Sequence, residues 1–245
     1  MTRLPVLAVL GLLAPLALAQ EAPSPAPEQV SVIATFVAKP GKEAALRAKL
    51  LKMIAPTRAE GGCLSYDLHV NPASPAQFVF IENWRNEEVL AAHMKTPHFV
   101  RLITNGTPAL LVAPYTVAKG RTLSRFQPRT QADPRLRSGA SLTLVAVFPF
   151  QPDKLEEALT PTRAMVAPTR AERGNISYDL NQSRTGANVL YYVENWESKA
   201  ALDAHMRTAH FVRHIDRETA PKLAAPYVIL MLKRISPPGY GRGAR

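Results

Sequence analysis

Cysteine is almost absent from this chain of 245 residues, which contains Cys63 alone. A single cysteine excludes an intramolecular disulfide framework and any zinc or iron–sulfur site built only from thiolates. The chain also lacks the roughly 20 unbroken apolar residues that a transmembrane helix needs, because the apolar run within residues 4–18 is interrupted by Pro5, Gly11 and Pro15. At 47% hydrophobic residues, the remainder can still bury a sizeable core, which excludes global disorder, a collagen and a coiled coil.

Acidic residues are scarce relative to basic ones, with 19 Asp and Glu against 30 Lys and Arg and a formal net charge of +11. The excess is localised. Residues 119–138 carry a net charge of +5 and residues 233–245 carry +4, and Arg3 adds one more, so that +1 is left for everything else. We therefore interpret the charge as belonging to solvated, mobile segments, and it predicts no specific nucleic-acid partner.

The N-terminus has the pattern of a secretory signal peptide. Arg3 precedes an apolar stretch, and Ala17-Leu18-Ala19 forms a small-residue cleavage site before Gln20. We predict a signal peptide over residues 1–19 and a secreted or periplasmic mature protein that keeps no stable membrane insertion. Residues 20–28 are rich in proline and poor in apolar residues, so we expect a flexible leader there.

The rest of the chain is an internal duplication, with two copies of one sequence unit. Adding 112 to a residue number takes Ala55–Glu60 (APTRAE) to an identical hexapeptide at 167–172, and it does the same for Ser65–Leu68, Glu82–Trp84 and His98–Arg101. The match needs no gap between Val32 and Val117. We predict tandem domains at 29–119 and 140–235, joined by a basic linker at 120–139 and followed by a basic tail at 236–245.

Each unit has the pattern of a ferredoxin-like βαββαβ fold, which places the chain in the α+β class. In the first copy, alternation and turn residues predict strands at 30–38, 63–70, 77–84 and 114–119. Helical spacing and N-cap residues predict helices at 42–59, after Asn86, and from Thr96-Pro97 to Leu110. Because the strand face with Phe78, Phe80 and Trp84 also needs cover, we expect the two sheets to pack face to face as a pseudo-twofold pair. A ligand cavity is expected between or beside these sheets.

Three segments of the first copy resemble a known family. Ile81-Glu82-Asn83-Trp84, Leu90-Ala91-Ala92-His93 and Thr96-Pro97-His98-Phe99 are similar to the E-x-W…H…[ST]-x-H pattern of antibiotic biosynthesis monooxygenases, especially the quinol monooxygenase branch. The resemblance implies a dimeric α+β barrel, here formed within one chain. It also implies oxidation of a small aromatic substrate by O₂ without a cofactor, neither metal nor flavin.

Histidine is the candidate catalytic residue. Oxidising a phenol or hydroquinone without a cofactor requires its ionised form, so a base beside a dry cavity is needed, and an imidazole suits that task. His93 and His205 recur in register and are our candidate bases. His98 and His210 recur as well and are candidate substrate-binding residues, although a histidine in the first turn of a helix is often merely solvated. His69 and His214 lack a counterpart in the other copy and are set aside.

Four further pairs are candidate substrate-binding residues. Trp84 and Trp196 are expected to wall the pocket, although either could be a core aromatic. Glu82 and Glu194 share the face of the tryptophans, where a carboxylate is either a structural partner of Arg101 or His93 or an acid in the cavity. The remaining candidates are Tyr66 and Tyr178, which could equally be core residues, and Asn83 and Asn195, which lie on the opposite strand face. Cys63 aligns with Asn175, so chemistry shared by both copies cannot depend on it.

Alternatives remain open at this point. The same cavity would serve a non-catalytic protein that binds small aromatic ligands. Haem degradation is disfavoured, because related haem degraders have asparagine near the positions of Ala34 and Ala146. A metal centre is also disfavoured, because His93 and His98 are five residues apart across a helix break rather than at the i, i+4 spacing of one helix face. Further association of chains into a homo-oligomer stays open.

Overall fold

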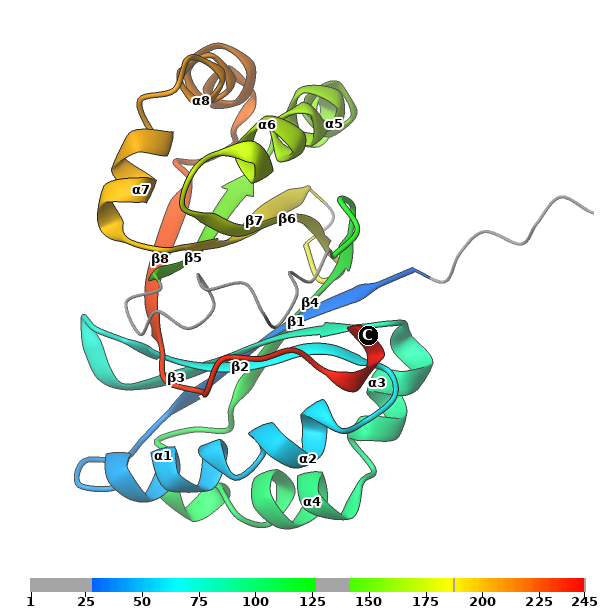
Figure 1. The fold of residues 1–245 in the computed structure, drawn as a ribbon, viewed down its shortest axis with the longest axis vertical. Coiled ribbons are helices and arrows are strands. Elements are labelled where there is room, and N and C mark those ends of the chain that lie inside the picture. The colour runs from blue at the N-terminus through cyan, green and yellow to red at the C-terminus, as the bar shows by residue number, and fades with distance from the viewer. Residues whose placement is uncertain (1–27, 127–141, 187, 245) are drawn as a thin grey trace, which may run out of the picture.

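The computed structural model describes residues 28–126, 142–186 and 188–244. The predicted signal peptide, almost all of the predicted leader and residues 127–139 of the predicted linker lie outside the described residues. Figure 1 shows helices in two outer layers and strands between them. Within the described ranges, no helix has both the length and the apolar character that a membrane crossing requires.

Both copies have the predicted βαββαβ order. The elements of the first copy are β1 (Val30–Val37), α1 (Glu43–Leu51), α2 (Ile54–Arg58), β2 (Cys63–Asn71), β3 (Ser74–Trp84), α3 (Glu87–His93), α4 (Pro97–Phe99), a π-helical turn (Val100–Thr104), a 3₁₀ turn (Pro108–Leu110) and β4 (Thr116–Thr122). Those of the second are β5 (Leu142–Pro149), a 3₁₀ turn (Pro152–Lys154), α5 (Leu155–Ala164), α6 (Val166–Ala171), β6 (Asn175–Ser183), β7 (Val189–Trp196), α7 (Lys199–His205), α8 (Ala209–Arg213), a π-helical turn (His214–Thr219), a 3₁₀ turn (Ala220–Lys222) and β8 (Val228–Arg234). A last 3₁₀ turn, η7, spans Arg242–Ala244.

Local sequence explains where these helices begin and break. The side chain of Asn86 accepts a hydrogen bond from the Val89 amide at 3.0 Å, and Ser198 does the same for Ala201 at 3.2 Å, which confirms both as N-caps. The helix predicted over 42–59 is two helices, α1 and α2. Pro56 has no backbone N–H to donate to the carbonyl of Lys52, four positions earlier, and the helix is interrupted between Leu51 and Ile54.

The eight strands close into one barrel in the order β1-β3-β2-β8-β5-β7-β6-β4. Strands from different copies meet at two seams. At one seam β2 pairs with β8 through Val70 and Lys233, and at the other β4 pairs with β6 through Arg121 and Gln182. The barrel therefore has no free sheet edge, and the intrachain dimeric α+β barrel implied by the family resemblance is confirmed.

Our expectation about which strand face meets the other sheet was wrong. Phe78, Phe80 and Trp84 belong to a core cluster with the helix residues Leu46 and Leu50, so this face packs against the helices. The barrel interior is filled instead from the opposite face by smaller side chains of both copies, principally Val79, Ile81, Val145, Val193 and Leu232, together with Tyr191. An eight-stranded barrel leaves little interior space, which suits β-branched side chains, while the large aromatics occupy the layer beneath the helices.

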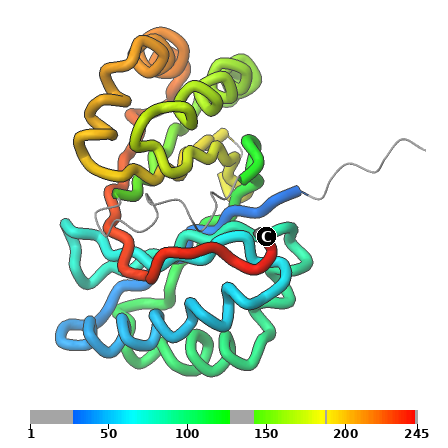
Figure 2. Tube along the Cα trace, in the orientation of Figure 1, coloured from blue at the N-terminus to red at the C-terminus, as the bar shows by residue number. Residues whose placement is uncertain are grey.

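The basic segments after β4 and β8 are more ordered than we expected. Each crosses to the other copy at equivalent positions: the Leu123 amide donates to the Leu180 carbonyl at 2.8 Å, and the Ile235 amide donates to the Leu68 carbonyl at 2.8 Å. The Gly241 amide then donates to the Leu64 carbonyl at 2.9 Å, so the tail packs along β2, where Figure 2 shows it in red. Residues 120–126 and the described tail therefore belong to the folded unit.

A repeated serine fixes both crossings. Ser236 Oγ accepts a hydrogen bond from the Leu68 amide at 3.2 Å and donates to Asp67 Oδ1 at 2.9 Å, and Asp67 is also paired with Arg58 at 2.6 Å. Ser124, which lies 112 residues earlier than Ser236, accepts from the Leu180 amide at 2.9 Å. The period of 112 therefore continues beyond Val117, where the sequence match ends.

Candidate functional site

Two histidines and one glutamate meet on the helix side of the first sheet. His93 Nδ1 lies 2.7 Å from Glu60 Oε1, and His98 Nε2 lies 3.0 Å from the same oxygen. His93 is buried, whereas the side chains of Glu60 and His98 are 20% and 16% exposed. The carboxylate therefore holds a buried imidazole on one side and a partly exposed one on the other.

The chain geometry around Glu60 explains how these residues meet. Glu60 follows the end of α2, and the turn that carries it presses against α3. A Cβ atom on Gly62 would lie 2.5 Å from Val89 Cβ, so glycine is required at this close approach. Thr96 ends the turn after α3 by donating from Oγ1 to the His93 carbonyl at 2.8 Å, and its side chain also caps α4. The Thr96-Pro97 break thereby turns His98 back towards the glutamate.

The hydrogen bonds assign the proton positions on His93. A carboxylate only accepts, so Nδ1 of His93 carries the proton and donates it to Glu60. In the neutral imidazole, Nε2 then has a free lone pair. This Nε2 is buried and, within the described part of the chain, has no hydrogen-bond partner. The arrangement is that of a general base whose tautomer and orientation are set by a carboxylate.

Trp84 and Glu82 support the other side of His93. The indole Nε1 of Trp84 donates to Glu82 Oε2 at 2.8 Å, and the Trp84 ring lies against the His93 ring with centroids 4.6 Å apart. Burial raises the pKa of Glu82 to about 7, opposed by the electrostatic effect of the nearby His93 and by the Trp84 hydrogen bond. The hydrogen-bond partner of this carboxyl is thus Trp84, not Arg101 or His93, the two structural partners that we had considered.

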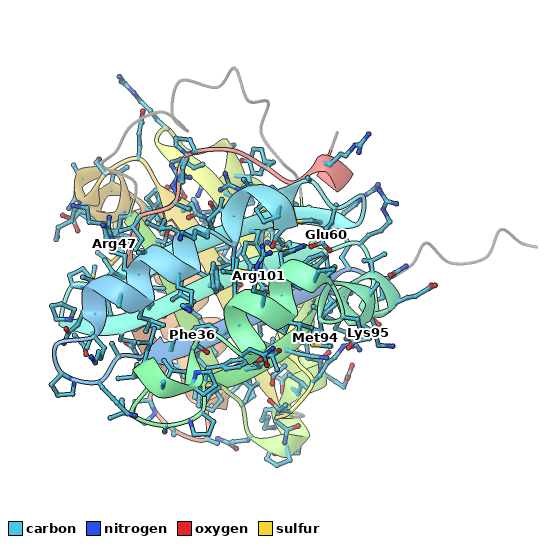
Figure 3. All side chains as sticks on the ribbon, turned by 90° about the horizontal axis from the view of Figure 1, so that it is seen from below. Phe36, Arg47, Glu60, Met94, Lys95 and Arg101 are labelled. Carbon is cyan, nitrogen blue, oxygen red and sulfur yellow. The ribbon has the colours of Figure 1, made fainter. Side chains whose placement is uncertain are left out.

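A cavity of about 40 Å³ lies beside these groups, between the sheet and α3. Its wall is mostly apolar, and its polar members are Tyr66, Glu82, His93, Tyr115 and Lys119. Figure 3 views the helix layer of the first copy, with Met94, a residue at the cavity rim, and Glu60 labelled. The volume is enough for a few water molecules. An aromatic ring needs more room, so its entry requires lining side chains to move; Met94, one of them, is 40% exposed.

The second copy repeats the central geometry. His205 Nδ1 lies 2.7 Å and His210 Nε2 lies 2.8 Å from Glu172 Oε1, and Trp196 Nε1 donates to Glu194 at 2.8 Å. His205 Nε2 is also buried without a partner among the described residues. Burial lowers the pKa of His205, against the opposing effect of Glu172, and raises the pKa of Glu194 to about 7.

Most of the residues predicted from sequence converge here, and some do not. Tyr66, Glu82 and His93 line the cavity, while Trp84 is fully buried behind His93 and Glu82 rather than in the cavity wall. Asn83 lies on the barrel side, where its Nδ2 donates to Ser65 at 2.8 Å, and Asn195 does the same with Ser177 at 2.8 Å. These two asparagines are therefore separated from the cavity by the sheet.

Sequence reasoning missed Glu60 and Glu172. Both close the hexapeptide APTRAE, which is the longest identical stretch shared by the two copies. This identical stretch was the signal in the sequence that could have indicated them, because the glutamate at its end is an ionisable residue kept in both copies. Our objection to a metal based on the spacing of His93 and His98 was also misplaced, because the chain turn between them brings both rings to one carboxylate.

The same three residues could hold a metal ion. One ligand atom each from Glu60, His93 and His98 lies within 4.8 Å of the others, and Glu172, His205 and His210 form an equivalent group. Two imidazoles and a carboxylate form a donor set suited to zinc or non-haem iron. A metal would have to replace the protons on the two nitrogens that now face the carboxylate.

Comparison with known proteins assigns the family. The sequence profile described as "Antibiotic biosynthesis monooxygenase" matches residues 29–104 and again residues 141–217. The chain belongs to this family. A relative in Mycobacterium tuberculosis, named "Putative monooxygenase Rv0793", is 39% identical over 92 residues, which are 35% of this chain and 90% of the relative. Another in Bacillus subtilis, named "Putative monooxygenase YcnE", is 37% identical over 70 residues, or 29% of this chain and 74% of the relative.

The arrangement of both copies also occurs in solved structures. A crystal structure from Fusobacterium nucleatum, described as a "Putative monooxygenase", superposes with a TM-score of 0.75 at 14% identity and covers 88% of this chain and 96% of the other. One from Lactobacillus acidophilus gives a TM-score of 0.66 at 15% identity and covers 87% of this chain and 98% of the other. At these identities the likeness concerns the fold alone.

Proposed function

We propose that this family member is an exported, cofactor-independent monooxygenase that oxidises a small phenolic or hydroquinone substrate with O₂. One observation carries the proposal: a carboxylate-oriented histidine presents a buried Nε2, unpartnered among the described residues, beside a mostly apolar cavity. The glutamate–histidine geometry recurs 112 residues later. The family membership supports the reaction class.

The residues would act first on a proton. Nε2 of His93 accepts the phenolic proton, and Glu60 stabilises the resulting imidazolium through Nδ1. The phenolate that forms is a far better electron donor to O₂ than the phenol. Apolar walls exclude water from the phenolate, while Trp84 keeps the imidazole plane fixed. Positioning and proton transfer of this kind contribute about 10²- to 10⁴-fold to a rate.

The oxidation then balances without an external reductant. The phenolate transfers one electron to O₂, and the resulting superoxide couples to a ring carbon of the phenoxyl radical. The ring peroxide anion takes back the proton held on His93 Nε2, which restores the base, and the hydroperoxide so formed loses water, which leaves a carbonyl. For a para-hydroquinone, one hydroquinone and one O₂ give one hydroxyquinone and one water, with both electron pairs supplied by the substrate.

The test is O₂ uptake by the mature protein with a panel of substituted hydroquinones, compared with a buffer blank. We expect uptake above the blank, and loss of at least a hundredfold in the rate constant when His93→Gln and His205→Gln are combined. His69→Asn is a matched control, since it replaces a buried histidine outside the cavity with the residue that the second copy has at that position, Asn181. Circular dichroism checks that each variant is folded.

The possible outcomes separate two readings of the site. If the rates equal the blank across the panel but calorimetry detects binding of the same compounds, the enzyme hypothesis fails. The protein would then be a non-catalytic binder of small aromatic ligands. Full activity in the double histidine variant would refute the assignment of the base while leaving the reaction class intact. Export is tested separately: the mature protein should begin near Gln20 by mass spectrometry of the secreted or periplasmic fraction.

A further inference from the structure

The two copies of the site differ at residues that line the cavity, where a ligand would be in contact. Of the residues that line the first cavity, Phe80 is replaced in the second copy by Tyr192, and Lys119 is replaced by Met231. The central glutamate, histidines and tryptophan are unchanged. Because both copies belong to one chain, each site is free to differ, and these two replacements change the chemistry of the cavity wall.

The first replacement decides whether a tyrosine hydroxyl is available. In the second copy Tyr192 donates to the Thr162 carbonyl at 2.8 Å, and Tyr178 is hydrogen-bonded to Tyr192. In the first copy the equivalent of Tyr178 is Tyr66, which packs against Phe80 with ring centroids 4.6 Å apart. Phenylalanine offers no hydroxyl, so this neighbour leaves the Tyr66 hydroxyl open to a ligand. Burial holds the pKa of Tyr66 well above its ordinary range, which keeps the hydroxyl a donor.

The second replacement puts a cation beside the first cavity alone. Lys119 lines this cavity, with its Nζ 2.6 Å from Glu87 Oε1. Glu87 is shared with a second cation, since Arg184 of the other copy lies 3.3 Å from it. Arg184 also lies 3.1 Å from Glu28, which Arg121 approaches to 3.8 Å. Three cations therefore share two carboxylates, and this cluster beside the cavity rim keeps a net charge of +1. In the second copy this wall position is Met231, which is 42% exposed.

We propose that the two sites are not equivalent: the first cavity binds the substrate as its phenolate, with the Tyr66 hydroxyl as donor to the phenolate oxygen and the Lys119 ammonium at the rim as a favourable charge, and the second site does not bind it. This inference rests on the proposed function for its substrate class. A buried hydroxyl and a cation both favour the ionised phenol over the neutral one. The second site lacks the cation, and its tyrosine proton is already used within the protein.

The test uses 4-nitrophenol, whose phenolate absorbs visible light and therefore reports its own ionisation state. By calorimetry and difference spectroscopy we expect one equivalent bound per chain, in the phenolate form. Lys119→Met, which copies the second site, should weaken binding at least tenfold, and Tyr66→Phe several-fold. The matched control is Met231→Leu at the equivalent position, which should leave binding unchanged. Combining Tyr192→Phe with Met231→Lys should create a second equivalent.

Three results would overturn the inference: no binding of nitrophenol, two equivalents of equal affinity in the unaltered protein, or unchanged affinity in a folded Lys119→Met variant. O₂ uptake separates this inference from the proposed function. If nitrophenolate binds once and Lys119→Met abolishes it, but no hydroquinone is oxidised, the asymmetric binding stands and the enzyme fails. If His93→Gln and His205→Gln each halve the oxidation rate, the enzyme stands and the asymmetry fails.

Discussion

We predict that the two buried glutamates, Glu82 and Glu194, make the stability of the fold fall as the pH rises. Burial raises the pKa of Glu82 to about 7 from an ordinary value of 4.5, and Glu194 behaves in the same way. The native state therefore holds more protons than the unfolded state between these two values, so the free energy of unfolding decreases with pH across that window. A pKa change of this size corresponds to on the order of 3 kcal/mol for each carboxyl. The contribution is fully present below pH 4.5 and is lost as the pH rises through about 7.

The perturbation is Glu82→Gln combined with Glu194→Gln. Glutamine cannot ionise, and its carbonyl oxygen can still accept from the indole N–H of Trp84 or Trp196. Other groups also titrate in this range: His205 has a lowered pKa and contributes a slope of the opposite sign. The informative quantity is therefore the difference in the free energy of unfolding between the double variant and the unaltered protein, measured by urea denaturation at several pH values from about 5 to 8.

We expect this difference to move in favour of the double variant by several kcal/mol from the acid to the alkaline end of the series. A matched control replaces two exposed carboxylates, Glu88 and Glu156, by glutamine and should give a difference that is flat with pH. If the double variant of the buried pair is also flat to within about 0.5 kcal/mol, the two glutamates are not held protonated by burial, and the description of the site electrostatics is wrong.

Three further predictions concern the site and the crossings between copies. Glu60→Gln combined with Glu172→Gln should lower kcat about tenfold or more with little change in KM and should alter the pH profile, and an unchanged profile would show that the carboxylate does not act through the histidine. Dialysis against a chelator should leave O₂ uptake unchanged, whereas loss of activity that is restored by zinc or iron would assign the Glu60–His93–His98 cluster to a metal. Ser236→Ala should cost about 1–2 kcal/mol in urea denaturation, because it leaves the buried Leu68 amide without its acceptor and removes one of the two partners of Asp67. Ser124→Ala at the equivalent position should cost a similar amount.

Local signals carried most of the fold prediction. The strands and the short helices were predictable because alternation, N-cap residues and the Thr96-Pro97 pair act within a few residues of where they stand, and the caps at Asn86, Thr96 and Ser198 are confirmed. The duplication strengthened each assignment, since both copies had to satisfy it. Closure of the barrel followed from the family resemblance rather than from the pattern of either copy.

Features that depend on which surfaces meet in space were not predictable in the same way. Alternation correctly separated Phe80 and Trp84 from Val79 and Ile81, but alternation alone does not indicate which of the two sets faces the helices. That choice depends on the volume available inside the barrel. The crossings of residues 120–126 and 235–241 were missed for a related reason: their backbone groups bond to the other copy, so composition alone suggested solvated segments.

The comparison between copies also separates what the fold requires from what the ligand requires. Glu60, Trp84, His93 and His98 all have an identical counterpart, and each is tied to another member of the set by a hydrogen bond or a ring contact. Replacing one of them would strand a buried partner, so identity at these positions is expected whether or not both sites are active. Phe80 and Lys119 contact the cavity without being required by that set, and there the copies differ. Identical central residues combined with different cavity-lining residues are the pattern expected if both copies keep the same structural unit while only one of the two sites binds the ligand.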